Sequence, residues 1–251
     1  SACLVGSEMC IRDRLRFILQ KFLSDTQLGV DGATFSRFIY SAPILMLLAP
    51  LWFGYFGYPI VADNFFIFSA IGGIAQILAT LCVIALFKQR NFAVGIAFKK
   101  TETLQIAVIS LVVLGEKVSI NALCAICIGF VGLVLLSKQP LKRSFLEEGV
   151  FNRSVFLGLL SGFLFAISVV YYRSSTLNVL DESSINRAIF TLTFVLVFQV
   201  IAMGGWLMLF NRDELKAVWK VRSVAIWVGL TSLAGSFCWF WAFSLVNAAL
   251  V

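Results

Sequence analysis

Long uncharged stretches alternate with short polar ones along the chain. Six stretches without Asp, Glu, Lys or Arg are long enough to cross a bilayer as helices, which takes about 20 apolar residues. They cover residues 38–62, 64–87, 118–137, 154–172, 188–211 and 223–251. Lys99, Lys100 and Glu102 interrupt a seventh stretch, about 91–115, and residues 15–23 form a shorter one. The pattern predicts an all-α integral membrane protein, a polytopic bundle with about eight transmembrane helices.

Composition supports this assignment and excludes several other classes. Of the 251 residues 60% are apolar and only 13% are charged, far from the composition of soluble domains. Strict alternation over many short strands is missing, which excludes a transmembrane barrel. The chain has no His, the commonest metal ligand and general base. The Cys residues inside apolar stretches are expected to be small buried hydrophobes. We therefore expect no cofactor, no metal site and no enzymatic activity.

The positions of the basic residues predict the orientation of the chain. The stretches are numbered in chain order, with residues 15–23 as the first and 91–115 as the fourth. The loops after the third, fifth and seventh stretches hold ten basic residues: Lys88, Arg90, Lys138, Lys142, Arg143, Arg153, Arg212, Lys216, Lys220 and Arg222. The loops after the second, fourth and sixth hold only Lys117, Arg173 and Arg187. Lys and Arg concentrate on the cytoplasmic side of membrane proteins. The net charge of +7 is thus a topology signal and not a sign of a nucleic-acid partner, and we expect a protein of the bacterial cytoplasmic membrane.

Neither end of the chain has the pattern of a transmembrane domain boundary. Residues 3–14, CLVGSEMCIRDR, resemble a translated sequencing-library adapter, so we expect residues 1–14 to be a non-native segment; the alternative is an ordinary polar tail. The other end stops inside an apolar run at residues 248–251. We therefore expect the C-terminus to be truncated.

Two halves of the chain resemble each other. Gly-Ala-Thr-Phe-Ser-Arg37 aligns with Glu-Ser-Ser-Ile-Asn-Arg187, and each precedes an apolar stretch. Gly72 likewise aligns with Gly229, and Ala85 with Ala242. The first half has five spans, so the second half begins in the opposite orientation. This parity indicates an inverted repeat, a common design of transporters.

Three motifs point to a family. They are Phe98-Lys-Lys-Thr-Glu102, Leu114-Gly-Glu-Lys-Val-Ser119 and Gly129-Phe-Val-Gly-Leu-Val-Leu-Leu136. Through them the chain resembles an EamA-like member of the drug/metabolite transporter superfamily. The resemblance implies two inverted five-helix repeats around a substrate cavity, with Gly115 and Glu116 as the turn that ends the fourth helix.

The resemblance also implies a division of the chain. Residues 15–137 would form the first repeat, residues 138–153 a basic linker loop, and residues 154–251 a second repeat without its last two helices. Members of the family are generally described with both termini in the cytoplasm, whereas the Lys/Arg count places the N-terminus outside.

The charges inside the fourth span are the first candidates for chemistry. Lys99 and Glu102 are three residues apart, so they lie on one helical face and can pair, and Thr103 continues that face. Ionisable groups near mid-membrane are costly and normally face a bundle interior. In one interpretation, Lys99 or Lys100 attracts an anionic group of the substrate and Glu102 exchanges a proton. In the other, the helix is shifted and both Lys side chains reach an interface.

A second group of candidates comes from polar residues on or before apolar spans. Arg37 and Arg187 hold matching positions in the repeat, where they either cradle one substrate from two sides or anchor the helix boundaries. Amide and hydroxyl side chains on the spans either line a cavity or form interhelical hydrogen bonds. These are Gln76, Thr80, Gln105, Ser110, Gln199, Ser236 and Asn247.

The sequence therefore predicts a secondary transporter that exports small metabolites, such as amino acids or related amphiphilic compounds, by alternating access with possible proton coupling. Its partners would be a small-molecule substrate and the lipid bilayer, with no obligate protein partner. The chain lacks a G-x-x-x-x-G-K-[ST] loop, which excludes ATP-driven pumping by this chain. The alternatives are a membrane-embedded enzyme and a structural membrane subunit.

Overall fold

The computed structural model describes residues 16–89, 99, 101–115, 121, 124, 125, 128, 129, 132 and 153–245. Several sequence predictions concern residues outside this set: the non-native segment 1–14, most of the fifth span and of the linker 138–153, the C-terminal residues 246–251, Lys100 and Glu116.

Helices dominate the described part of the chain, as predicted. Residues 16–26 are helical and are followed by α2 (Val30–Ile39) and α3 (Ala42–Phe56). Then come α4 (Phe65–Phe87), α6 (Glu102–Leu114) and α9 (Arg153–Leu177). The last three helices are α10 (Ser184–Phe210), α11 (Arg212–Lys220) and α12 (Arg222–Leu245).

Five of the described segments are long and apolar enough to cross a membrane: Val30–Phe56, Phe65–Phe87, Arg153–Leu177, Ser184–Phe210 and Arg222–Leu245. Four of them coincide with the predicted spans at 64–87, 154–172, 188–211 and 223–251. The helices at 154–172 and 188–211 begin or end up to five residues outside the predicted ranges.

The second predicted span begins earlier than the charge pattern suggested. We expected it to start at residue 38, after Arg37, but α2 begins at Val30 and Arg37 lies in its last turn. The helix begins there because a distant carboxylate caps it: Gly29 N donates to Oε1 and Oε2 of Glu214 at 2.9 and 3.0 Å. An acceptor at a helix N-terminus satisfies backbone N–H groups that lack intrahelical partners.

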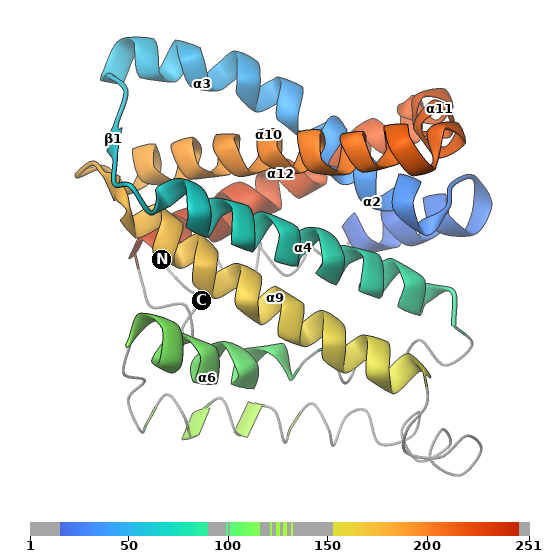
Figure 1. Ribbon diagram of the computed structural model, residues 1–251, viewed down its shortest axis with the longest axis horizontal. Helices are drawn as coiled ribbons and strands as arrows, with labels where there is room; N and C mark the ends of the chain where they lie inside the picture. The colour runs from blue at the N-terminus through green and yellow to red at the C-terminus, as the bar shows by residue number, and fades with distance from the viewer. Residues whose placement is uncertain are drawn as a thin grey trace.

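A small antiparallel sheet marks one end of the bundle. β1 (Ile60–Val61) lies between α3 and α4, and β2 (Val179–Leu180) lies between α9 and α10. Ile60 pairs with Leu180 and Val61 with Val179. The contact between Gly29 and Glu214 marks the opposite end, where α2 starts and α11 lies (Figure 1). The segment formed by α2 and α3 therefore runs towards the sheet, and so does α12. Both α4 and α10 run away from the sheet.

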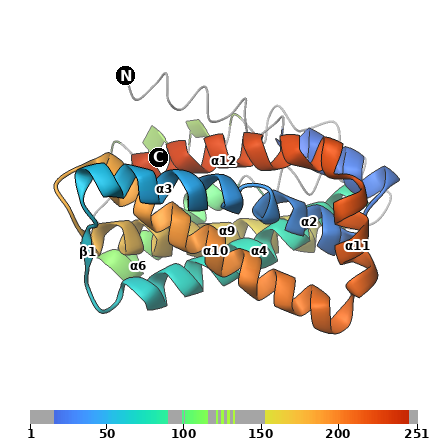
Figure 2. The same ribbon diagram turned by 90° about the horizontal axis from the view of Figure 1, so that it is seen from above.

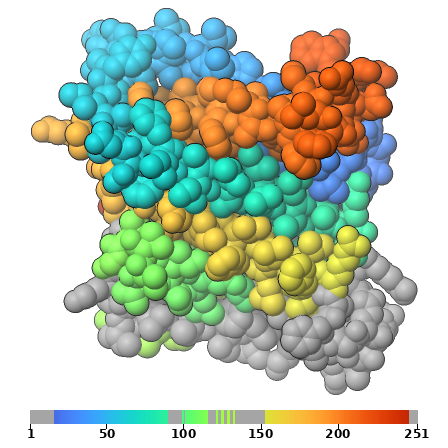
Figure 3. Space-filling view, in the orientation of Figure 1, coloured from blue at the N-terminus to red at the C-terminus, as the bar shows by residue number. Residues whose placement is uncertain are grey.

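The helices from the two halves of the sequence pack into one body. α4 lies along α9 and also contacts α10, and Figure 3 shows α10, α4, α9 and α6 side by side across one face. Small residues permit the close approaches: a Cβ on Gly72 would lie 2.7 Å from the Tyr172 ring, and one on Gly229 would lie 2.6 Å from Tyr40 Cβ. The predicted repeats are therefore not separate globular domains.

Candidate functional site

Arg37 lies inside the bundle. Arg37 is only 2% exposed, and its guanidinium donates hydrogen bonds to side chains of two other spans. Nε donates to Ser232 Oγ at 2.8 Å, and Nη1 donates to Thr80 Oγ1 at 3.3 Å. Nη2 donates to Ser236 Oγ at 3.5 Å. The interpretation of Arg37 as a boundary anchor is therefore wrong, because α2 begins two turns earlier, at Val30, and carries Arg37 into the interior.

Three further side chains form a hydrogen-bonded group next to this guanidinium. Tyr172 Oη donates to Gln76 Oε1 at 3.0 Å. Gln199 Nε2 donates to the same oxygen at 2.9 Å, to Tyr172 Oη at 3.1 Å and to the Gly73 carbonyl at 3.3 Å. Gln199 is fully buried, and its Oε1 has no hydrogen-bond partner among the described residues. An amide oxygen left this way in the interior favours a donor that arrives from outside the protein.

One turn of α4 joins the two groups, since Thr80 Oγ1 donates to the Gln76 carbonyl at 2.8 Å. We call the combined set the polar cluster. It consists of Arg37, Gln76, Thr80, Tyr172, Gln199, Ser232 and Ser236.

Several members of the polar cluster lie near the middle of the membrane-length segments. Gln76 is close to the centre of α4 (Phe65–Phe87), and Ser232 and Ser236 lie on either side of the centre of α12 (Arg222–Leu245). An Arg at the centre of a membrane helix costs about 2.5–3.5 kcal/mol on insertion scales, and such residues commonly mark substrate or ion pathways. Five spans contribute side chains here, so the cluster also bonds those spans to one another.

The sequence identified most of the polar cluster. It named Arg37, Gln76, Thr80, Gln199 and Ser236, and the structure brings these side chains together. Two members were missed. Ser232 lies one turn before Ser236 on the same face of α12, a spacing that the sequence already contained. The charge pattern makes Tyr172 the last residue of a span, and only its contacts with Gly72 and Gln76 show that its side chain points inward.

Lys99 and Glu102 pair as their spacing predicted. Lys99 Nζ donates to Glu102 Oε2 at 2.6 Å, and the two side chains are 13% and 19% exposed. The ammonium also lies 4.5 Å from the centroid of the Phe165 ring. A Cβ on Gly162 would lie 3.0 Å from the Lys99 carbonyl, so the pair lies against the middle third of α9. Lys99 therefore points towards aromatic and acidic partners and not towards an interface.

Thr103 does not share the face of this pair. Thr103 is exposed, whereas Ile106 is buried. The expected face assumed one continuous helix through Lys99, but α6 begins at Glu102 after the cap residue Thr101. Gln105 lies on the packed side instead, because its Oε1 would be 3.3 Å from a Cβ on Gly162. Its Nε2 donates to Thr101 Oγ1 at 3.1 Å.

Arg187 lies far from Arg37, so the two do not hold one ligand from opposite sides. Arg187 is half-buried in the first turn of α10, and its Nη2 donates to the Ser244 carbonyl at 3.1 Å. Arg173 Nη1 donates to the neighbouring Phe243 carbonyl. Arg37 instead contacts α12 at Ser236, about 12 Å from Ser244 at 1.5 Å per residue. The structure thus agrees with the boundary-anchor interpretation for Arg187 alone.

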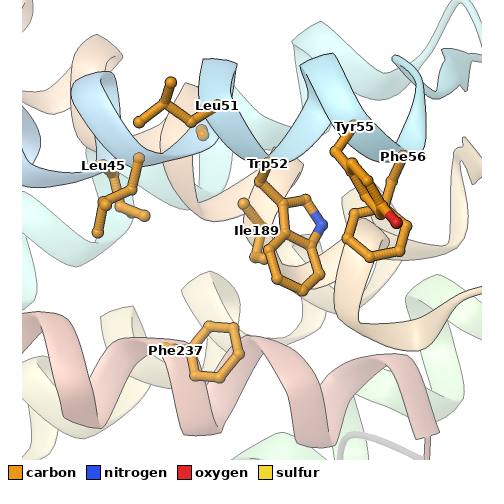
Figure 4. A pocket seen from close by; sticks show the side chains of 9 residues that line it. Leu45, Leu51, Trp52, Tyr55, Phe56, Ile189 and Phe237 are labelled. Carbon is orange, nitrogen blue, oxygen red and sulfur yellow. The ribbon is translucent and has the colours of Figure 1, made fainter.

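An apolar groove lies between α3, α10 and α12 (Figure 4). Its volume is about 510 Å³. Trp52 and Ile189 face Phe237 across it, and Phe237 follows Ser236 of the polar cluster in the chain. The Trp52 indole donates to Asn186 Oδ1 at 2.9 Å, which fixes the ring. The groove suits an apolar group, because its lining side chains are aliphatic and aromatic.

The predicted turn after the fourth span is present at Gly115. α6 ends at Leu114, and Gly115 caps it with φ +65°, a left-handed conformation that favours glycine. Within the described residues, no group of three or more Cys, Asp or Glu side chains is placed to hold a metal ion.

Comparison with known proteins adds no family assignment. No family model matches the chain, and no curated protein shows significant similarity to it. The EamA-like resemblance therefore remains a prediction that rests on the motifs themselves.

Proposed function

We propose that this chain is a secondary transporter for small amphiphilic metabolites and that the polar cluster is its substrate site. One observation carries the proposal: a buried guanidinium, Arg37, contacts hydroxyls that lie away from the ends of two membrane-length segments. Midplane sites between helices are typical of secondary transporters.

The chemistry of the cluster suits a ligand with an anionic group. The side-chain oxygens that accept from Arg37 in the cluster belong to neutral hydroxyls of Thr80, Ser232 and Ser236. A carboxylate at this place gains a charge-assisted, bidentate hydrogen bond that hydroxyls do not provide. The Gln199 Oε1 atom offers an acceptor for an ammonium or amide group of the same ligand, as in an amino acid.

Helix directions support an inverted repeat. The segment Val30–Phe56 and its predicted counterpart α10 run in opposite directions, as do α4 and α12. Two halves related in this way exchange conformations when the bundle rocks around a central site, which is the basis of alternating access.

The Lys99–Glu102 pair is the proposed proton-coupling element. At 2.6 Å the carboxylate stabilises the ammonium, and protonation of Glu102 removes that attraction. A proton gradient can therefore bias the position of α6 against α9, provided that the two states of the transporter differ in this contact.

Ligand binding tests the proposed site directly. The purified chain is heated with a panel of amino acids and related carboxylates, and its melting temperature is recorded. We expect one class of carboxylate to raise the melting temperature of the parent protein. Arg37→Gln should abolish this shift.

Thr231→Ala is the matched control. The Thr231 hydroxyl donates to its own helix, at the Trp227 carbonyl, at 2.8 Å, so this variant should keep the full shift. A shift of equal size in Arg37→Gln would place the ligand elsewhere, and the absence of any stabilising compound would favour a purely structural network.

A further inference from the structure

α11 lies across one end of the bundle and not along it. Arg212–Lys220 connects the end of α10, at Phe210, with the start of α12, at Arg222. Figure 2 shows it running across the ends of these two helices. Since the long helices cross the membrane, α11 lies close to the plane of the membrane surface.

Its inner side is fixed by contacts with α2. Val218 is 3% exposed, and its backbone carbonyl accepts from Tyr40 Oη at 2.9 Å. Glu214 binds the N-terminus of α2 through Gly29 N. Contacts with α2 therefore hold the inner side of α11 against the bundle. The outer side of α11 does not take part in these contacts.

The outer side is strongly basic. Four cationic side chains are exposed here: Arg212, Lys216 and Lys220 of α11, and Arg222, the first residue of α12. One exposed acid accompanies them, because Asp213 lies 3.4 Å from Lys216. The surface thus carries an excess of positive charge.

Two exposed indoles flank these cations. Trp219 is 65% and Trp227 is 60% exposed, and the Arg222 guanidinium lies 5.7 Å from the Trp219 ring centroid. Trp is enriched at the level of the lipid headgroups, where its ring is partly in hydrocarbon and its N–H is solvated.

We propose that this surface binds the phosphate headgroups of anionic phospholipids. Lys220 and Arg222 would contact the phosphates while Trp219 and Trp227 lie between neighbouring lipids. The proposal does not depend on the substrate site, because none of these residues belongs to the polar cluster. Each Lys or Arg near an anionic membrane surface strengthens association about fivefold.

The test measures the association of spin-labelled lipids with the full chain in phosphatidylcholine vesicles. We expect spin-labelled phosphatidylglycerol to associate more strongly than spin-labelled phosphatidylcholine, and the preference should decrease at high salt. The double variant Lys220→Gln/Arg222→Gln should lower this preference roughly twentyfold. If the preference of the parent protein is smaller than this, the double variant should abolish it.

The double variant Lys88→Gln/Arg153→Gln is the matched control, because it removes two exposed cations from the same end of the bundle but outside this surface. Because no α11 side chain is changed, this control should lower the preference clearly less than Lys220→Gln/Arg222→Gln does. Equal losses in both double variants would overturn the proposal and leave a diffuse charge effect. Equal association of the two lipids with the parent would also overturn it and would favour a soluble acidic partner.

Discussion

Arg37 is accommodated in the bundle by hydroxyl groups. Guanidinium presents five N–H donors, and hydroxyls on two neighbouring spans, Thr80, Ser232 and Ser236, accept from it. Hydroxyls are neutral, so these three contacts place no negative charge beside the guanidinium. The shortest of these contacts, to Ser232 at 2.8 Å, should contribute most to stability.

Replacement of that hydroxyl tests its contribution. We expect Ser232→Ala to lower the free energy of unfolding by about 1–2 kcal/mol, because it removes an acceptor from a buried cation. Thr231→Ala, on the neighbouring residue, should change it by less than about 0.5 kcal/mol. Unfolding in mixed micelles, followed by circular dichroism, measures both values. Similar losses in the two variants would show that Arg37 does not depend on Ser232.

Glu102→Gln tests the proposed coupling. The variant keeps the shape of the side chain but removes the group that takes up a proton, so uptake should lose its dependence on a pH gradient. Lys99→Ala and Lys100→Ala should still insert into the membrane, since each removes a charge from an apolar segment. Substrate flux into vesicles with and without the gradient is the measurement. Unchanged gradient dependence in Glu102→Gln would exclude this carboxylate as the proton carrier.

The residues of the cluster were predictable as types but not as a network. Amides and hydroxyls on apolar spans are conspicuous, and this identified Gln76, Thr80 and Gln199. The depth of Arg37 was not visible, because a charge at the edge of an apolar stretch usually marks the end of a span. Arg37 lies in the interior because Glu214 caps α2 and the helix therefore begins before Arg37. Glu214 and Gly29, the two residues of this contact, are 185 positions apart in the sequence.

At the scale of elements, two glycines set how closely the helices approach. Gly72 and Gly229, which the repeat aligns, each lie against a tyrosine: Tyr172 in one case and Tyr40 in the other. At Gly229 the obstacle to a Cβ includes the Tyr40 carbonyl carbon at 2.9 Å. Backbone moves less readily than a side chain, so this contact is the less forgiving of the two.

We therefore expect Gly229→Ala to destabilise the protein by about 1–3 kcal/mol, the usual cost of overpacking. Gly205→Ala is the matched control in α10, because nothing lies within 4 Å of its added Cβ. There the higher helix propensity of Ala should leave stability unchanged or raise it by up to about 1 kcal/mol. Thermal unfolding of the two variants measures both effects. Equal melting temperatures would contradict the close approach at Gly229.

The cap on α2 provides a second test at this scale. Glu214→Gln should cost about 1 kcal/mol, since it removes the negative charge from the N-terminus of α2. Asp213→Asn changes the preceding residue, which is exposed and lies 3.4 Å from the exposed Lys216 ammonium, and should have a smaller effect. Melting temperatures compare the two, and a larger loss in Asp213→Asn would exclude the cap as the cause.

The sequence predicted the long helices well and the connections poorly. The apolar stretches are long enough to identify spans without any tertiary information. α11 was counted as a loop because its charge dominates its composition, although Asp213 and Glu214 at its start and Lys220 at its end are typical of a helix. The two-residue strands are too short for any periodicity to indicate them.

At the scale of the whole molecule, the structure separates the basic end from the sheet end. Lys88 follows α4, Arg153 begins α9, and α11 lies at the same end (Figure 1). The described residues of the predicted cytoplasmic loops thus lie on one side, as a single orientation requires. A cytoplasm-specific reporter fused after Pro140 should be active. Activity of an extracytoplasmic reporter at this position would instead indicate the orientation usual in the EamA-like family.

Substrate flux tests the central claim most directly. The full chain is reconstituted in vesicles, and uptake of the carboxylate that binds best is compared for the parent, Arg37→Gln and Arg212→Gln at equal protein levels. Arg212 is an exposed cation outside the polar cluster, so its variant should transport at the parent rate. We predict that Arg37→Gln lowers the rate at least tenfold, about the loss of one charge-assisted hydrogen bond. Equal rates in Arg37→Gln and the parent, or a parent rate no higher than that of protein-free vesicles, would contradict a substrate site at Arg37.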